Sequence, residues 1–253
     1  MRVIVLSSGS RGNTTYIECG STKILIDIGN SCKYVVDKLK GFGVNAEEID
    51  AIFLTHTHVD HIKGLKVFVN KYGTKVYLTK KMYDELSYIN NYMFIESDEL
   101  IFNDLFFKMI STSHDVTDSL GYIIEGNNKS VVYITDTGYI NNKYFDILKN
   151  RNVYIMESNH DIEMLNNGPY NFKLRQRILS DKGHLSNYDC SRYLANFIGS
   201  NTDTVVLAHL SEDNNTEELA YNTLVSRLRE CNNMVDRILI AKQNEELEEI
   251  IYD

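Results

Sequence analysis

The chain alternates short apolar runs with longer segments whose apolar residues recur at helical spacing. The short runs are rich in Val, Ile and Tyr, and most are bounded by Gly, Asn, Asp or Ser, which is typical of β-strands. The longer segments carry apolar residues three and four positions apart and predict amphipathic helices. We predict strands at 2–6, 15–19, 22–27, 51–55, 75–79, 106–112, 120–125, 130–135, 152–156, 203–208 and 236–241, and helices at 34–43, 62–73, 142–150, 187–199 and 216–231.

The interleaving of strands and helices favours sheets covered by helices, in the α/β (α+β) class. A chain of 253 residues can bury a sizeable core and lies near the upper size of one domain. A single Pro and 14 Gly argue against linkers and low-complexity segments. We therefore predict one domain over 1–253, with no disordered region other than a tail.

Composition excludes several classes of protein. The first residues, "MRVIVLSSGSRGN", have too short an apolar run for a signal peptide, and no stretch reaches the length of a membrane span. We therefore predict a cytoplasmic protein with no membrane partner. The cysteines lie far apart without Cys-x-x-Cys spacing, which predicts buried thiols and no disulfide-linked partner for Cys19, Cys32, Cys190 and Cys231.

The segment "THTHVDH", residues 55–61, holds three of the chain's seven histidines. It follows the predicted strand 51–55 and precedes the predicted helix 62–73, so it forms a loop between them. His56 and His58, two apart on extended chain, point to one side, and Asp60 and His61 follow where the backbone turns toward the helix. This arrangement lets one short segment supply ligands to two metal ions. The alternative is a surface loop that is rich in histidine by chance.

Two metals need further ligands, and other predicted strands end in suitable residues. His114, Asp136 and His209 each follow an apolar strand. Each alone could be a capping or turn residue, but together they predict a metal centre at one sheet edge. Asp27 ends the strand 22–27 and is better suited to holding a ligand histidine by a hydrogen bond than to binding metal.

These motifs resemble, in order and type, those of the metallo-β-lactamase superfamily. The resemblance covers almost the whole chain and implies a four-layer αβ/βα sandwich, with two sheets face to face and helices outside. It also implies two divalent metal ions, Zn or Mn. By this likeness one metal is bound by His56, His58 and His114, the other by Asp60, His61 and His209, and Asp136 bridges both.

A closer resemblance is to the YycJ/WalJ family of bacterial metallohydrolases, on "LSSGSRGNTTYIE", "HIKGLKVF", "TDTGY", "ESNHDIEML", "GPYNFKLRQRILSDKGHLSN" and "LAHLSEDNN". It implies a nuclease acting on DNA from a 5′ end. The chain is also similar to tRNase Z-type phosphodiesterases, in which a Glu and a His that is not a ligand assist the leaving group. Glu157 and His184 match those positions. Together with the metal ligand Asp60, they are the predicted catalytic residues. A capping role at a helix start is the alternative for His184.

A phosphodiester substrate also needs cationic side chains. Lys173, Arg175, Arg177 and Lys182 stand against Asp181 alone, a local charge of +3 in a chain of net charge −9. We predict phosphate contacts by Arg175, Arg177 and Lys173, although charges on a helix usually form a solvated face. The loop "SSGSRGN" could line the same pocket through Ser10 and Asn13.

The site residues together predict a dinuclear-metal phosphodiesterase whose substrate partner is nucleic acid, DNA in the first instance. Two alternatives stay open. One is a metallohydrolase of a small cyclic phosphodiester, thioester or lactone, using the same metals. The other is a metal-stabilised regulatory protein without turnover, which the complete ligand set disfavours.

Overall fold

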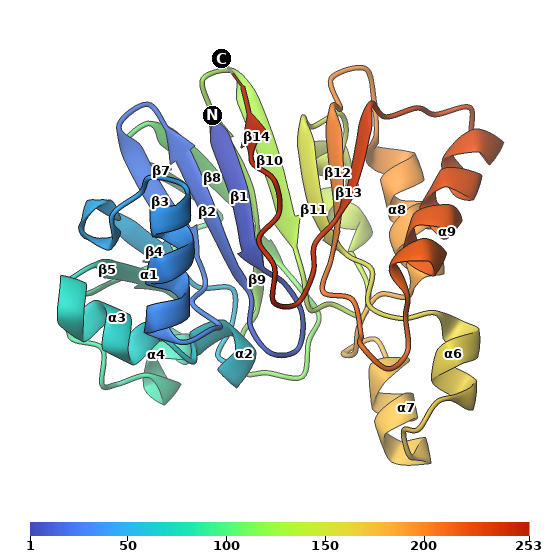
Figure 1. Ribbon diagram of the computed structural model, residues 1–253, viewed down its shortest axis with the longest axis horizontal. Helices are drawn as coiled ribbons and strands as arrows, with labels where there is room; N and C mark the ends of the chain where they lie inside the picture. Colours follow the sequence, from blue (N-terminus) through green and yellow to red (C-terminus); the bar gives the residue numbers. More distant parts are fainter. Residues whose placement is uncertain (253) are drawn as a thin grey trace.

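The computed structural model describes residues 1–252, which fold into two mixed β-sheets that face each other, with helices on their outer sides (Figure 1). This confirms the predicted αβ/βα sandwich. That residues 1–253 form one domain stays a prediction, and Asp253 lies outside the described residues.

The first sheet has the strand order β14-β1-β2-β3-β4-β5-β6. Its first strands pair antiparallel, and β3 to β6 run parallel. The strands are β1 (Arg2–Ser7), β2 (Thr14–Cys19), β3 (Thr22–Ile26), β4 (Ala51–Phe53), β5 (Lys75–Leu78), β6 (Tyr92–Phe94) and β14 (Ile250–Ile251).

The second sheet has the order β13-β12-β11-β10-β9-β8-β7. Its strands are β7 (Glu99–Phe102), β8 (Leu105–Ser111), β9 (Leu120–Gly126), β10 (Lys129–Ile134), β11 (Val153–Glu157), β12 (Thr204–Ala208) and β13 (Arg237–Ile240). β8 and β10 both pair antiparallel with β9, and β10 to β13 are parallel. Strands β8, β10, β11 and β12 therefore all end at the same edge of the sheet.

Helices cover the outer face of each sheet, with α1, α3 and α4 beside the first and α8 and α9 beside the second, while α6 and α7 lie beyond the strand ends (Figure 1). Within residues 1–252, no helix is long and apolar enough to cross a membrane. The α-helices are α1 (Cys32–Gly41), α2 (Val59–Ile62), α3 (Leu65–Tyr72), α4 (Lys80–Glu85), α5 (Phe145–Leu148), α6 (Ile162–Asn167), α7 (Phe172–Ile178), α8 (Asn187–Phe197) and α9 (Glu217–Glu230), with 3-10 turns η1 (Ala46–Glu48) and η2 (Asn142–Tyr144).

Strand β10 shows why the central strands are apolar without alternation. Val131 and Tyr133 belong to the core between the two sheets, whereas Val132 and Ile134 pack under the helices of the second sheet. Successive side chains of a strand point to opposite faces, so a strand covered on both faces is apolar throughout.

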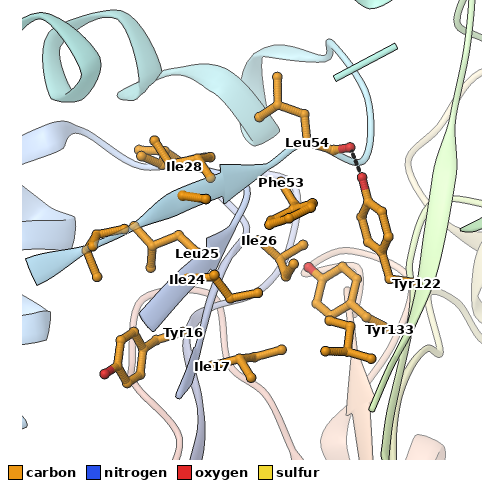
Figure 2. Close-up of a cluster of buried hydrophobic side chains, with 14 of the residues drawn as sticks. Tyr16, Ile17, Ile24, Leu25, Ile26, Ile28, Phe53, Leu54, Tyr122 and Tyr133 are labelled. Carbon is orange, nitrogen blue, oxygen red and sulfur yellow. Dashed lines mark hydrogen bonds between the residues drawn. The ribbon is translucent and has the colours of Figure 1, made fainter. Parts of the chain in front are cut away.

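Aromatic rings join the two sheets. Phe53 of β4 stacks on Phe107 of β8 with ring centroids 4.1 Å apart, and Tyr122 of β9 meets Phe53 edge-on at 6.2 Å. The buried Tyr122 hydroxyl donates to the carbonyl of Leu54, in the segment that leads to the histidine-rich loop (Figure 2). The core thus anchors the beginning of that loop.

Several predictions were wrong in detail. The predicted helix 62–73 is divided, because Gly64 lies between α2 and α3, where a Cβ would come within 2.2 Å of the Asn30 carbonyl oxygen. Cys231 is exposed, because it follows the last turn of α9, and the four cysteines are free. As far as Tyr252, the C-terminal segment is not a free tail, since β14 pairs with β1 and Arg2 forms an ion pair with Glu249.

Candidate metal centre

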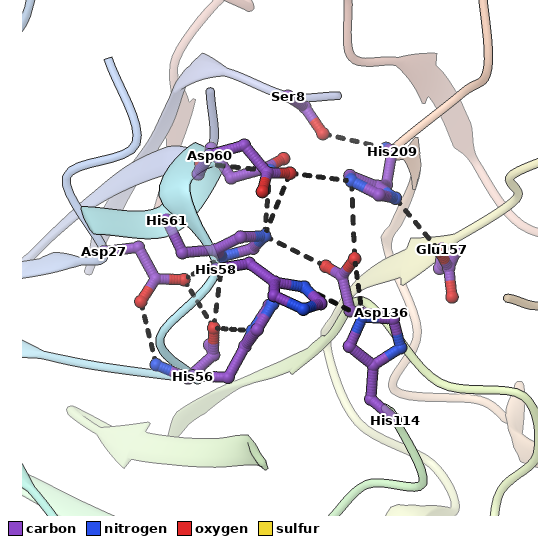
Figure 3. A network of polar contacts seen from close by, with 12 residues as sticks. Ser8, Asp27, His56, His58, Asp60, His61, His114, Asp136, Glu157 and His209 are labelled. Atoms are coloured by element: carbon purple, nitrogen blue, oxygen red, sulfur yellow. Dashed lines mark hydrogen bonds and ion pairs between the residues drawn. The ribbon is translucent and has the colours of Figure 1, made fainter. Parts of the chain in front are cut away.

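The predicted site residues gather where strand ends of the two sheets meet (Figure 3). The first sheet supplies Asp27 after β3, the loop after β4 that carries His56 and His58, and α2, which carries Asp60 and His61. The second sheet supplies His114 after β8, Asp136 after β10, Glu157 at the end of β11 and His209 after β12. Parallel strand direction therefore brings residues distant in sequence to one edge.

Helix α2 is held against the loops after β1 and β3 by backbone contacts. The Asp60 carbonyl accepts from Asn13 N at 2.8 Å, and the His61 carbonyl accepts from Ile28 N at 2.9 Å. A Cβ at Gly29 would lie 1.8 Å from the Asp60 carbonyl oxygen, so only glycine allows this approach. Asp60 and His61 thus stand on a short helix and not, as predicted, in the loop before it.

One cluster consists of three imidazoles, those of His56, His58 and His114. Their ring centroids lie 4.8 to 5.2 Å apart, all with edge-to-face geometry. His114 Nε2 approaches His58 Nδ1 to 3.2 Å. Each ring offers a nitrogen within 4.8 Å of the others, a spacing that suits a shared cation.

A second cluster is formed by Asp60, His61 and His209, and Asp136 lies between the two. The Asp60 carboxylate is 3.7 Å from His61 Nε2 and 3.6 Å from His209 Nε2. Asp136 Oδ2 is 3.1 Å from His61 Nε2, and its Oδ1 is 3.5 Å from His209 Nε2 and 3.9 Å from His114 Nε2. Asp136 therefore faces both clusters at once.

The arrangement fits divalent cations. Within residues 1–252, the buried His56 Nε2 and His209 Nε2 have no hydrogen-bond partner. Buried polar atoms are normally satisfied, so these nitrogens are accounted for when they coordinate an ion. Mixed imidazole and carboxylate donors are ligands that Zn and Mn both accept.

Burial and charge act differently on the imidazoles. Burial lowers the pKa of His56 well below its usual value. Burial also acts to lower the pKa of His61, but the Asp136 and Asp27 carboxylates outweigh it and raise this pKa to about 10. In the absence of a cation, His61 therefore carries a positive charge beside the carboxylates of Asp136 and Asp27.

Asp27 orients His61 from behind. Its Oδ2 is 2.7 Å from His61 Nδ1, and it is fully buried. Thr55 donates to the same carboxylate through its backbone N at 2.8 Å and its hydroxyl at 2.7 Å. A carboxylate on Nδ1 leaves Nε2 to face the cluster, which is how such groups orient a ligand histidine. The contribution of Thr55 had not been anticipated.

Three of the site residues have a left-handed backbone directly after a strand. Asp27, Asp136 and His209 have φ of 59°, 55° and 55°. This conformation is uncommon outside glycine, although Asp and His are among the residues that adopt it most readily. It turns the chain sharply at the strand end, where Asp136 and His209 face His61 and Asp60 of the first sheet and Asp27 faces Thr55 and His61 of its own.

Glu157 contacts both late histidines. Its Oε1 is 2.7 Å from His184 Nδ1 and 3.0 Å from His209 Nδ1, and its Oε2 accepts from Thr137 N and Leu185 N at 3.0 and 3.2 Å. Burial acts to raise the pKa of Glu157, but His184 and these hydrogen bonds outweigh it and lower the pKa to about 2. The carboxylate is therefore ionised and positions both rings. His184 precedes α8, whose N-terminal cap is Ser186.

The predicted substrate contacts are only partly brought together. Arg177 and Ser10 line a cavity of about 180 Å³ beside His184 and His209, whereas Arg175 donates to the Asn166 carbonyl and Lys173 is exposed on α7. Arg175 and Arg177 lie only two positions apart on the same short helix, so sequence proximity to His184 did not tell which of them faces the site.

Three further residues contact the site: Asn13, which was predicted, and Asn159 and Asp115, which were not. Asn13 Nδ2 lies 3.0 Å from His61 Nε2. Asn159 donates to the His209 carbonyl at 2.9 Å. Asp115, directly after His114, pairs with Arg177. Asp115 was missed, although its place beside a predicted ligand was a signal for it.

The two-sheet fold and the His/Asp clusters at its edge define an enzyme of the metallo-β-lactamase fold with a site for divalent metal. The profile of the Beta-lactamase superfamily domain matches residues 22–209, and the chain belongs to this family. Within it, the chain belongs with two proteins named exodeoxyribonuclease. It is 36% identical over 236 residues to "Exodeoxyribonuclease WalJ" of Streptococcus pneumoniae, covering 90% of this chain and 88% of that protein.

The chain is likewise 36% identical over 233 residues to "Exodeoxyribonuclease YycJ" of Bacillus anthracis, covering 89% of this chain and 88% of the relative. Among solved structures, the metallo-β-lactamase fold protein YhfI from Bacillus subtilis superposes with a TM-score of 0.73. That match covers 97% of this chain and 98% of YhfI at 18% identity, and so bears on the fold alone. The predicted resemblance to the family is confirmed.

Proposed function

We propose that this protein is a dinuclear-metal phosphodiesterase that degrades DNA as an exonuclease from 5′ ends, in the cytoplasm. The names of the two relatives at 36% identity over most of the chain support a DNA substrate. The 5′ polarity rests on the family resemblance in the sequence motifs. The presence of two ions, Zn or Mn, is part of the proposal.

The observation that carries the proposal is the position of Asp136 between the two clusters. His56, His58 and His114 would hold one cation, Asp60, His61 and His209 the other, and Asp136 would contact both. Bound there, divalent cations supply a Lewis acid for phosphoryl oxygens and lower the pKa of water enough to provide a nucleophile near neutral pH.

The chain's own residues complete the reaction. Glu157 engages Nδ1 of His184, so Nε2 is the nitrogen left to give a proton to the departing oxygen of the nucleic-acid chain. The His184 side chain is 20% exposed and lines the cavity beside the metal clusters, where a substrate can reach it. Asp60 would act as a metal ligand. Ser10 lines the same cavity and would contact the substrate there.

The test uses the full-length protein loaded with Zn or Mn and the same oligonucleotide labelled at either end, both as single strand and as duplex. With the 5′ label we expect early release of short labelled products. With the 3′ label we expect a ladder of progressively shorter labelled strands. The opposite pattern would overturn the polarity, and internal cleavage of a circular strand would overturn exonuclease action.

Small substrates serve as the contrasting arm. Bis-p-nitrophenyl phosphate and a lactone are assayed beside the oligonucleotides. Rapid turnover of either with inert DNA would assign the site to small-molecule hydrolysis. Metal-loaded protein that turns over none of them would favour a regulatory role.

A further inference from the structure

The Asp115 carboxylate stands at the rim of the histidine cluster. Its Oδ1 is 3.5 Å from His114 Nε2 and 3.8 Å from His58 Nε2, while its Oδ2 accepts a hydrogen bond from Arg177 Nε. The Asp115 side chain is 27% exposed and that of Arg177 is 56% exposed. One acidic side chain thus lies between the candidate metal ligands and Arg177.

This ion pair stands where two cavities meet. The cavity of about 180 Å³ is lined by Arg177, His184 and His209, and another of about 600 Å³ is lined by His58 and Glu85. Asp115 and Lys182 line both cavities, whereas Arg177 lines only the smaller. The side chain of Asp115 therefore separates two hollows on either side of the cluster.

A carboxylate at this place opposes a polyanionic substrate, unless it can be displaced. The planar guanidinium of arginine binds carboxylate and phosphate in the same forked geometry, so one can exchange for the other. Within residues 1–252, Arg177 is the hydrogen-bond partner recorded for the Asp115 carboxylate. Ion pairs this exposed contribute little to stability, so the exchange is not costly.

We propose that the place now taken by the Asp115 carboxylate is a binding subsite for a backbone phosphate of the polynucleotide strand. When a strand binds, a phosphate next to the scissile one displaces Asp115 and takes over Arg177. The two cavities then form one groove past the metal centre, with Lys182 in its wall. This inference rests on the proposed function, because it requires a strand with more than one phosphate.

The contacts distinguish this subsite from the rest of the basic segment. Arg175, two residues earlier on α7, donates to the Asn166 carbonyl, and Lys173 is exposed on the same helix. Neither residue lines the two cavities. The subsite therefore requires Arg177 and does not require Arg175.

The test measures the Kd of a short single-stranded oligonucleotide by fluorescence anisotropy, with the full-length, metal-loaded protein. Asp115→Asn should lower Kd about threefold to fivefold, since an exposed ion pair of at most about 1 kcal/mol corresponds to a factor of about five. KM for DNA should fall in parallel with kcat kept, while KM for bis-p-nitrophenyl phosphate, which has a single phosphate, should not change.

Arg177→Ala should raise Kd and reduce the slope of log Kd against log salt by about 0.7, the value for one phosphate contact on a single strand. In the double variant with Asp115→Asn, the gain in affinity should fall to the small electrostatic effect of removing one negative charge, because no guanidinium is left to release. Glu230→Gln is the matched control. It removes one negative charge at the far end of α9 and should leave Kd unchanged.

The outcomes are distinct. Unchanged or raised Kd in Asp115→Asn, a loss of bound metal in that variant, or a gain of undiminished size without Arg177 each overturns the subsite. Wild-type protein that binds the strand but does not cleave it overturns the proposed function, and Kd still decides the subsite. Wild-type protein that neither binds nor cleaves the strand overturns both.

Discussion

His184 and His209 both precede a Leu-Ser pair and both contact Glu157, yet we expect different results from replacing them. His209→Ala should lower metal occupancy at one site. His184→Ala should keep both metals and lose turnover on DNA. The nitrogen of His184 that approaches Asp136, at 3.7 Å, is Nδ1, which is already bonded to Glu157. His209 instead directs Nε2, which has no hydrogen-bond partner among residues 1–252, toward Asp60 and Asp136.

The size of the loss in His184→Ala follows from the role of a proton donor. General acids contribute about 10² to 10⁴ in rate, or about 2.7 to 5.4 kcal/mol of activation free energy. The His184 ring is 20% exposed, so water can enter the vacated space and donate a proton in part. We therefore expect a loss in the lower half of that range, about 10² to 10³.

The assay combines metal analysis of the purified variants with two substrates. On an oligonucleotide, whose departing oxygen needs a proton, the His184→Ala loss should have its full size of about 10² to 10³. On bis-p-nitrophenyl phosphate it should shrink, because p-nitrophenolate leaves without a proton. Glu157→Gln should show both defects, since Oε1 serves both rings.

The reasoning fails if His184→Ala is the variant that loses metal, in which case the roles of the two histidines are reversed. It also fails if the activity loss is equal on both substrates, because a proton donor affects them differently. Normal metal content in His209→Ala would remove that residue from the ligand set.

Three further predictions concern metal and stability. Chelation should abolish DNA cleavage, and Zn or Mn should restore it; full activity in exhaustively demetallated protein would contradict this. Asp27→Asn should weaken metal affinity about tenfold to a hundredfold, measured by titration with a competing chelator, because the buried carboxylate that orients His61 is lost. Tyr122→Phe should lower the free energy of unfolding by about 1 to 3 kcal/mol in urea titrations, since the buried Leu54 carbonyl loses its donor. An unchanged urea midpoint of unfolding would contradict this prediction, because the Leu54 carbonyl would then have found another donor.

The sequence predicted the layers and the members of the cluster because both depend on local pattern. Apolar runs such as Val131 to Ile134 are apolar on both faces, and the site residues follow such runs directly. Strands β6 and β7 were not predicted, because their burial is partial and their apolar runs are short or interrupted. Helices α4 and α6 span six residues each, too few for a periodicity to be recognised.

Contacts between distant segments could not be predicted in the same way. The pairing of Arg177 with Asp115 depends on how α7 folds over the loop after β8, which no spacing records. The same holds for Arg175, which differs from Arg177 by two positions on one short helix and has a different partner. Helix α2, with Asp60 and His61, is set by tertiary hydrogen bonds to the loops after β1 and β3.

The left-handed backbone at Asp27, Asp136 and His209 bears on how this fold evolves. Each such residue costs of order 1 kcal/mol compared with an ordinary conformation, while glycine adopts the same backbone without a steric penalty. The backbone conformation by itself therefore favours glycine at all three positions, although Asp27 also holds the buried Thr55 and His61 by hydrogen bonds. Selection for activity is what preserves Asp136 and His209. Relatives that have lost catalysis should accordingly collect glycine or asparagine there while keeping the sandwich intact.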